Sequence, residues 1–345
     1  MAARQTRRHA PKSEAKLDLV RLIHAFEVTN RAANKSPKTT AWYSSNLGLF
    51  KDFLIARGHS LAIDDVGLEE AREYVLYLQE RKRFEGHPLT PARDQKLSPL
   101  TVQAHVRTLK AFYAWLFDEG YTKSNKLERL SRPKVPKRYV DVLREDEIRR
   151  ILSCIRQDDA IGTRDMAMVV TLLDTGLRLA ELVNLKRADA RIEEGQLKVM
   201  GKGSRERFVP IGASTQRLLL RYVYRARPEP AAPSVDSLFL EADGSPLTVN
   251  CVRLMLERLG RRSGVTRLHA HLCRHTFATN YLLNGGDIFS LQQILGHSSL
   301  EMVRSYVTLA SAQVTVQHRK FSPMDRMGLN GKGRNHMNGP RTGAP

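Results

Sequence analysis

The chain has 345 residues, enough for two domains that each bury a core, and its composition excludes collagen, miniature and disulfide-scaffold proteins. It carries 56 Lys and Arg residues against 36 Asp and Glu residues, a formal net charge of +20. This excess indicates a polyanionic partner, with nucleic acid as the first candidate. Residues 1–140 hold +11 of the charge and residues 141–345 hold +9, so a basic tail alone does not explain it.

Cysteine content and hydropathy together predict a protein of the cytosol or nucleoid. Three cysteines without paired spacing fit a reducing compartment better than a disulfide framework. The longest strongly apolar run, residues 166–173, is far shorter than the ~20 residues that span a bilayer, so no membrane segment is expected. Residues 1–16 contain three arginines but no hydrophobic region, which predicts a basic flexible arm and not a secretory signal.

Residues 17–121 have helical apolar spacing and no strand alternation, which predicts an all-helical domain with basic faces suited to a DNA duplex. The clearest helix has Ser98 as N-cap and Pro99 at its first position, and it ends at Gly120. Another helix is expected over residues 68–83. Residues 122–140 are basic and interrupted by two prolines, which predicts a linker that is either a solvated connector or a strap across a phosphate backbone.

Residues 141–322 are expected to form a second, mixed α+β domain that contains one small antiparallel β-sheet. The whole chain is therefore expected to be mainly α. The sheet is expected within residues 191–211, where apolar pairs flank glycine-rich turns. Helices are expected around it, at residues 148–155, 166–173, from 215, and at 248–262, 272–284, 289–295 and 299–308. The Gly-rich and Asn-rich residues 323–345 predict a disordered tail.

The second domain holds side chains suited to breaking a phosphodiester bond without a metal. Such a reaction needs cations on the non-bridging oxygens, an in-line nucleophile and an acid for the leaving oxygen. The candidates for these tasks are Arg178, Lys202, His271, Arg274, His297 and Tyr306. Taken singly, each has an ordinary structural explanation, such as a surface ion pair, a capping histidine or a packed tyrosine.

Spacing favours some of these candidates. Glu181 follows Arg178 by three residues on an expected helix, which allows its carboxylate to orient the guanidinium. His271 and Arg274 are also three apart, so imidazole and guanidinium share one helix face. His269, His271, Cys273 and His275 allow a rival metal site. We rank it low because the glutamate of the metalloprotease pattern is missing and Arg274 would lie beside the cation, so neither metal nor other cofactor is expected.

Four strings carry a specific resemblance: TGLRLAEL, GKGSRERFVPI, RHTFATNYLLNGG and LQQILGHSSLEMVRSY. Together with the order Arg, Lys, His-x-x-Arg, His, Tyr, they resemble the tyrosine site-specific recombinases, the phage integrase and Xer-type family. The resemblance covers about residues 141–320. The helical first part is similar, more weakly, to the core-binding domain of that family, and residues 141–322 correspond to its catalytic domain.

The resemblance implies a role for each candidate. Tyr306 would attack the scissile phosphate and form a 3′-phosphotyrosyl link, leaving a free 5′-hydroxyl. Arg178 and Arg274 would bind the phosphate oxygens. The remaining implied roles are leaving-group protonation for Lys202, proton transfer for His271, a phosphate hydrogen bond for His297 and support of the site for Glu181.

The implied function is cutting and rejoining DNA to integrate or excise a mobile element. The implied partners are double-stranded DNA, three further copies of the chain in a synaptic tetramer, and accessory DNA-bending proteins. Two alternatives remain open at this point. A type IB topoisomerase would relax DNA that lacks any recombination site, and a binding-only protein would form no covalent adduct with DNA.

Overall fold

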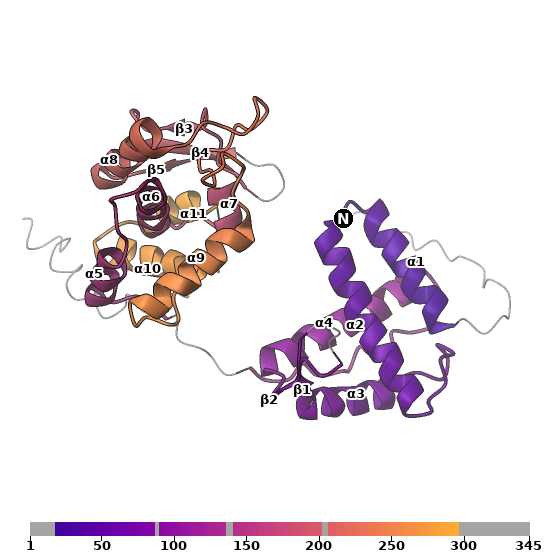
Figure 1. The fold of residues 1–345 in the computed structure, drawn as a ribbon. Coiled ribbons are helices and arrows are strands. Elements are labelled where there is room, and N and C mark those ends of the chain that lie inside the picture. The colour runs from indigo at the N-terminus through magenta and orange to yellow at the C-terminus, as the bar shows by residue number, and fades with distance from the viewer. Residues whose placement is uncertain (1–17, 87–89, 136–140, 202–205, 297–345) are drawn as a thin grey trace, which may run out of the picture. The chain divides into compact units, whose positions relative to one another are not determined.

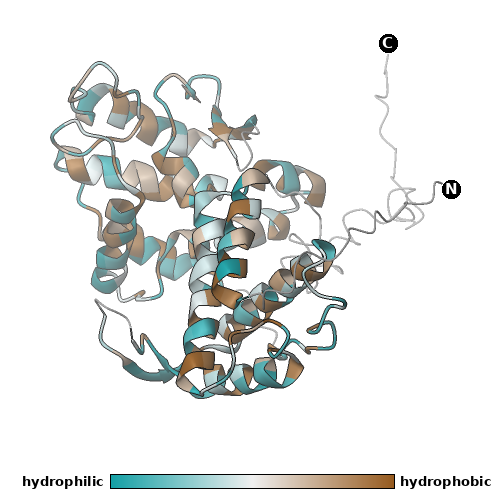
Figure 2. Cartoon of the chain, turned by 90° about the vertical axis from the view of Figure 1, so that its right-hand side faces the viewer, coloured by the Kyte–Doolittle hydropathy of each residue, from teal (hydrophilic) through white to brown (hydrophobic). Residues whose placement is uncertain are grey.

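The computed structural model describes residues 18–86, 90–135, 141–201 and 206–296, and the chain divides into two compact units, residues 1–138 and 139–345 (Figure 1). Both units are mainly helical, and the described strands form small antiparallel sheets. The predicted fold class is confirmed. The helices of both units contain hydrophobic as well as hydrophilic residues (Figure 2), as expected for elements that lie between a core and solvent.

Within residues 18–86 and 90–135, the helices of the first unit are α1 (Leu19–Ala32), α2 (Pro37–Ala56), α3 (Leu68–Glu80) and α4 (Pro99–Asp118). Their buried faces meet in one aromatic-rich core that includes Phe50, Tyr74 and Phe112. The start of α4 is as predicted, because the Ser98 side chain accepts a hydrogen bond from the Thr101 amide (3.2 Å) and Pro99 is the first helical residue.

The prediction that the first unit is entirely helical was wrong in one place. Strands β1 (Lys82–Arg83) and β2 (Arg93–Lys96) pair antiparallel between α3 and α4, and α3 ends at Glu80. All six strand residues are exposed. The strands bury no apolar side chain, so the alternation that reveals most strands in a sequence is absent here.

The chain after α4 packs onto the first unit before it reaches the second. Leu127 and Leu130 are buried in the first core. The Lys126 ammonium donates to the backbone carbonyls of Ile63 (3.0 Å) and Asp64 (2.6 Å). Lys126 of the predicted linker therefore contributes to the fold of this unit, while residues 136–140 lie outside the described structure.

A buried histidine makes the stability of the first unit depend on pH. His105 lies within hydrogen-bonding distance of the Tyr74 hydroxyl (3.1 Å between Nδ1 and Oη), and its pKa falls to about 4, chiefly because of burial and further because of the Arg81 charge. The unfolded chain, with a histidine pKa of ~6.5, binds the proton more readily. The free energy of unfolding of this unit therefore decreases as the pH falls below about 6.5.

We expect the free energy of unfolding of this unit to be about 2 kcal/mol lower at pH 5 than at pH 7. Urea titrations followed by tryptophan fluorescence test this, because the two tryptophans of the chain, Trp42 and Trp115, both lie in the first unit. The His105→Gln variant is the control, and most of this pH dependence should vanish in it. Equal pH dependence in both proteins would contradict the assignment.

The second unit surrounds a long central helix, α6 (Ala160–Thr175), which contacts α8 (Ala213–Arg221) and α10 (Ala270–Leu283). The unit also contains α5 (Glu145–Ser153), α7 (Leu179–Val183), a π-helical turn (Tyr222–Ala226), α9 (Val249–Arg262) and α11 (Ile288–Leu295). These match the predicted helices within the described residues. The prediction for residues 299–308 lies outside them, as do those for the arm and the tail.

The predicted antiparallel sheet is confirmed. It has the order β3 (Ala190–Arg191), β4 (Gln196–Met200), β5 (Glu206–Pro210). Leu197 lies opposite Val209, and both are buried, whereas the next pair on the same face of the sheet consists of Val199 and Arg207. The charged side chain of Arg207 therefore occupies an inward-facing position of β5.

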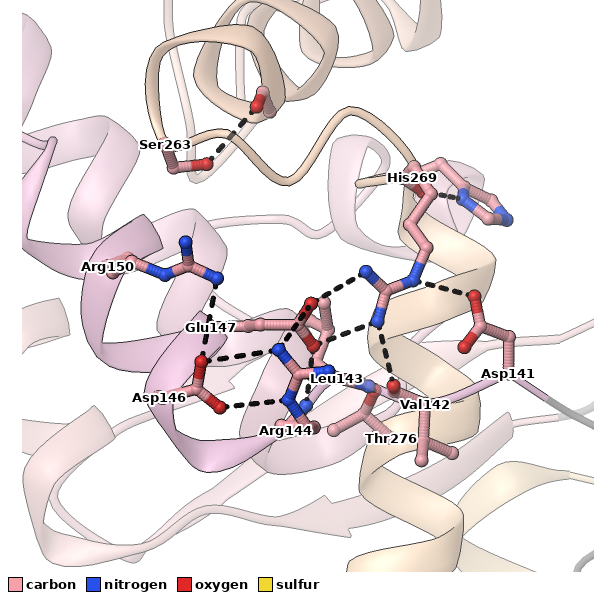
Figure 3. Close-up of polar contacts among 12 residues, drawn as sticks. Asp141, Val142, Leu143, Arg144, Asp146, Glu147, Arg150, Ser263, His269 and Thr276 are labelled. Carbon is pink, nitrogen blue, oxygen red and sulfur yellow. Dashed lines mark hydrogen bonds and ion pairs between the residues drawn. The ribbon is translucent and has the colours of Figure 1, made fainter.

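An ion-pair network ties the start of the second unit to the chain just before α10 (Figure 3). The Arg267 guanidinium binds the buried Glu147 carboxylate through two hydrogen bonds (2.7 and 2.8 Å) and Asp141 through a third (2.7 Å). Hydrogen bonds from Arg267 and from the Arg144 amide lower the pKa of Glu147 to about 2. In addition, the Leu143 amide donates to the Thr276 hydroxyl on α10 (2.9 Å). These contacts fix the N-terminal turn of α10, which carries candidate site residues.

Candidate active site

Arg178 stands immediately before α7 and forms the ion pair that its spacing from Glu181 predicts. Its guanidinium Nη1 lies 2.9 Å from Glu181 Oε1, and its backbone amide donates to Oε2 (2.9 Å). The Glu181 side chain is only 6% exposed, whereas that of Arg178 is 35% exposed. The carboxylate thus holds the guanidinium from the protein side, while part of the Arg178 side chain remains open to solvent.

Arg274 approaches the same place from α10. It is a buried residue, and its guanidinium donates to the carbonyls of Gly176 (2.6 Å) and Leu295 (2.7 Å). Gly176 ends α6 with a left-handed φ of 61°. A Cβ there would lie 2.5 Å from Phe277 and 2.9 Å from Leu295. Glycine is therefore required for the backbone turn that presents this carbonyl to Arg274.

The two arginines converge on one carbonyl at the end of α11. Leu295 O accepts from Arg274 Nη2 and, at 3.4 Å, from Arg178 Nη1. The last carbonyls of a helix lack partners within the helix and carry partial negative charge, which favours cations there. Two guanidiniums from distant parts of the sequence are thus held close together, an arrangement suited to a group with several negatively charged oxygens.

Sequence reasoning missed a third arginine in this cluster. Arg207 on β5 pairs with Glu181 through two hydrogen bonds (3.0 and 2.8 Å) and donates through Nε to the Ile294 carbonyl (2.9 Å). A Cβ on Gly296 would lie 3.0 Å from this guanidinium, so α11 ends directly against it. The signal in the sequence was a charged residue at the inward-facing position of an otherwise apolar strand pattern.

The charge state of Glu181 follows from these contacts. Burial by itself raises the pKa of this carboxyl. Hydrogen bonds from the Arg207 guanidinium and the Arg178 amide outweigh burial and lower the pKa below its ordinary value. Glu181 is therefore ionised at neutral pH and balances two neighbouring guanidiniums.

His271 lies in the first turn of α10 and shares the electrostatic environment of the arginines. Partial burial lowers its pKa, and the positive charges of Arg274, His269 and Arg178 lower it further. A neutral imidazole can accept a proton, as a general base must. His271 and His275 stack at 6.4 Å between ring centroids. Within the ranges that the structure describes, no three His, Cys, Asp or Glu side chains are placed to share a metal ion.

The described residues bring together four of the sequence candidates, namely Arg178, Glu181, His271 and Arg274. Lys202, His297 and Tyr306 lie outside the described residues. Lys202 belongs to the connection between β4 and β5, and Arg207 anchors β5 to α7. His297 directly follows Gly296. In the part of the chain open to description, no helix is long and apolar enough to cross a membrane.

Replacing Glu181 with glutamine is expected to destabilise the second unit by about 2–3 kcal/mol, because it leaves two guanidiniums next to each other without their shared anion. Urea denaturation followed by circular dichroism measures this loss, while tryptophan fluorescence reports the unaffected first unit. The matched control is Glu194→Gln, which removes an exposed carboxylate that pairs with Arg191 at 3.5 Å. If the two variants unfolded at the same urea concentration, Glu181 would not hold the cluster together.

Comparison with known proteins shows to which family the second unit is similar. The family model described as the phage integrase family matches residues 141–313. Tyrosine recombinase XerC of Oceanobacillus iheyensis is 31% identical over 294 residues, which cover 84% of this chain and 92% of the relative. Tyrosine recombinase XerD of Listeria monocytogenes is 31% identical over 235 residues, covering 67% of this chain and 79% of the relative.

Solved structures share the fold. The Tn1549 transposon integrase in complex with transposon right end DNA superposes with a TM-score of 0.68 at 21% identity, covering 90% of this chain and all of that one. A lambda integrase dimer bound to a COC′ core site gives 0.63 at 19% identity, covering 83% and 97%. The chain therefore belongs to the phage integrase family and is a site-specific tyrosine recombinase, an enzyme that cleaves and rejoins DNA.

Proposed function

We propose that Arg178 and Arg274 bind the non-bridging oxygens of a scissile phosphate and that the Tyr306 phenol attacks its phosphorus. The Tyr306 O–P bond forms as the bond from phosphorus to the 5′-oxygen breaks, which yields a 3′-phosphotyrosyl link and a free 5′-hydroxyl. The observation that carries this proposal is the convergence of both guanidiniums on the Leu295 carbonyl. Positive groups preorganised around one phosphate stabilise the charge that develops in the transition state.

In this mechanism the protons are handled by neighbouring groups. His271 accepts the proton of the Tyr306 hydroxyl, for which its lowered pKa suits it, and Lys202 donates a proton to the leaving 5′-oxygen. His297 donates a hydrogen bond to the phosphate. Glu181 does not touch the DNA but orients Arg178. Because the phosphotyrosyl bond conserves the energy of the phosphodiester, a second 5′-hydroxyl can rejoin the strand without ATP or a metal.

In the proposed domain organisation, the first unit binds DNA and the second unit carries out catalysis. Residues 17–121 form a core-binding domain on double-stranded DNA, and residues 141–322 form the catalytic domain. A basic arm (1–16), a basic linker (122–140) and a tail (323–345) complete the chain. The two compact units and the net charge of +20 support this division and a DNA partner.

The biological role that we propose is integration or excision of a mobile element. Similar folds in a transposon integrase and in lambda integrase, each solved with DNA, support it. The chain would act as a tetramer on two recombination sites, with accessory DNA-bending proteins, at the nucleoid in the cytoplasm. Sequencing the DNA that flanks the gene should reveal short repeated attachment sites. If no such repeats flanked it, the mobile-element role would be abandoned.

Trapping of the covalent intermediate tests the mechanism. The full chain is incubated, with and without chelator, with a nicked duplex that carries one flanking repeat and loses its 5′-hydroxyl fragment by diffusion. We expect a covalent adduct in which the protein is joined to the 3′-phosphate of the labelled DNA strand. The yield of this adduct should be unaffected by chelator. Dependence on divalent metal, or linkage through a 5′-phosphate, would contradict the mechanism. If supercoiled plasmids with and without the repeat were relaxed equally, the topoisomerase alternative would be favoured instead.

A further inference from the structure

The β1–β2 hairpin of the first unit is a strongly basic, exposed surface. We call its described residues, 81–86 and 93–96, the basic hairpin. It contains five cations and two carboxylates: Arg81, Lys82, Arg83, Arg93, Lys96, Glu85 and Asp94. All residues of both strands are exposed, so apolar burial does not explain why the chain forms them. A two-stranded hairpin is marginally stable in water by itself.

Both registered pairs of this ladder place like charges opposite each other. Lys82 lies across from Lys96, and Arg83 lies across from Arg93. Like charges directly opposite on paired strands are destabilising. Lys82 is balanced by Asp94 at 2.8 Å, and Lys96 contacts Glu80. In the part of the chain that the structure describes, neither Arg83 nor Arg93 has a carboxylate partner within ion-pair distance.

The two unpaired arginines are held on one aromatic ring. The guanidinium carbons of Arg83 and Arg93 lie 5.0 and 5.6 Å from the centroid of Phe84. Phe84 has a φ of 64°, a conformation that bulky side chains rarely adopt. Stacking on a ring limits the motion of a guanidinium while its N–H groups stay available for hydrogen bonds. The hairpin thus fixes two cations side by side against their mutual repulsion.

We propose that the basic hairpin is an additional DNA-binding element, in which Arg83 and Arg93 each bind a backbone phosphate of a duplex. A polyanion relieves the repulsion between the two cross-strand cations, and a two-stranded β-ribbon is narrow enough to enter the major groove. Contacts to phosphates strengthen binding without selecting a sequence. This inference rests on the proposed function, since it requires that the first unit lie on DNA.

The test compares full-length proteins on a fluorescent 40-base-pair duplex of mixed sequence, by anisotropy between 0.05 and 0.3 M KCl. The Arg83→Gln/Arg93→Gln double variant should bind about 60-fold more weakly at 0.1 M salt, and its log–log salt slope should be smaller by about 1.8, since each lost phosphate contact removes about 0.9. The matched control, Arg149→Gln/Arg156→Gln, removes two exposed arginines already paired with Glu145 and Asp158. Its slope should stay near that of the parent protein.

An opposite change provides a second arm. Asp94→Asn frees Lys82 from its carboxylate and should tighten binding severalfold without adding a side chain. If the parent protein failed to bind the duplex, the proposed function itself would fall. If the parent bound and the hairpin and control variants had equal slopes, the hairpin would not contact DNA. A hairpin variant that lost only self-association in sedimentation velocity would mark a protein interface and overturn the proposal.

Discussion

Replacing Tyr306 with phenylalanine is expected to abolish the covalent protein–DNA adduct and to lower the strand-cleavage rate by at least about 10⁴-fold. The change removes one oxygen atom, and no other group in the proposed mechanism supplies a nucleophile. DNA affinity should change less than twofold, because in the proposed mechanism Arg178 and Arg274, and not Tyr306, bind the phosphate. Denaturing gels of the nicked duplex measure the adduct, and anisotropy measures binding.

The control for this experiment is Tyr224→Phe. Tyr224 is an exposed tyrosine whose hydroxyl lies 3.4 Å from a Glu193 carboxylate oxygen, and it has no place in the proposed mechanism. Its loss should leave cleavage unchanged. An adduct that persisted in Tyr306→Phe at parental levels would show that another side chain attacks the phosphate.

Replacing Arg274 with lysine is expected to lower the single-turnover cleavage rate by about 10²–10³-fold, the range for removal of one preorganised donor to a developing oxyanion. The positive charge is kept, but an ammonium group lacks the planar fork that reaches the carbonyls of Gly176 and Leu295 together. The rate at saturating protein should fall, with little change in the concentration that gives half-saturation.

The matched control for Arg274 is Arg253→Lys on α9, an exposed arginine hydrogen-bonded to Asn250. Both variants should be checked by thermal denaturation, because Arg274 also joins α10 to the ends of α6 and α11. If Arg274→Lys cleaved DNA at the parental rate while folded, Arg274 would serve the fold and not the phosphate.

Most of the structural features that could be predicted from the sequence follow from local patterns. The N-terminus of α4 follows from Ser98 and Pro99, whose capping and φ restriction act within one turn. The ion pair of Arg178 with Glu181 follows from i, i+3 spacing on a helix. Cys273, between His271 and Arg274 on α10, is fully buried, as its small apolar side chain allows.

The missed features depend on contacts between residues distant in the sequence. Arg207 meets Glu181 only because β5 folds against α7, and no local spacing encodes that contact. The β1–β2 hairpin buries no apolar side chain, so periodicity gives no signal for it. Likewise, the Lys126 ammonium looked like linker charge, but it satisfies two backbone carbonyls from a loop about 60 residues earlier.

The most direct test of the proposed chemistry is to locate the DNA attachment by mass spectrometry. The trapped adduct is digested with nuclease and protease, and the peptide that carries the residual nucleotide is sequenced. The account predicts one modified peptide with the phosphate on Tyr306, joined to the 3′ end of the cleaved strand. Attachment to any other residue, or through a 5′ end, would contradict it.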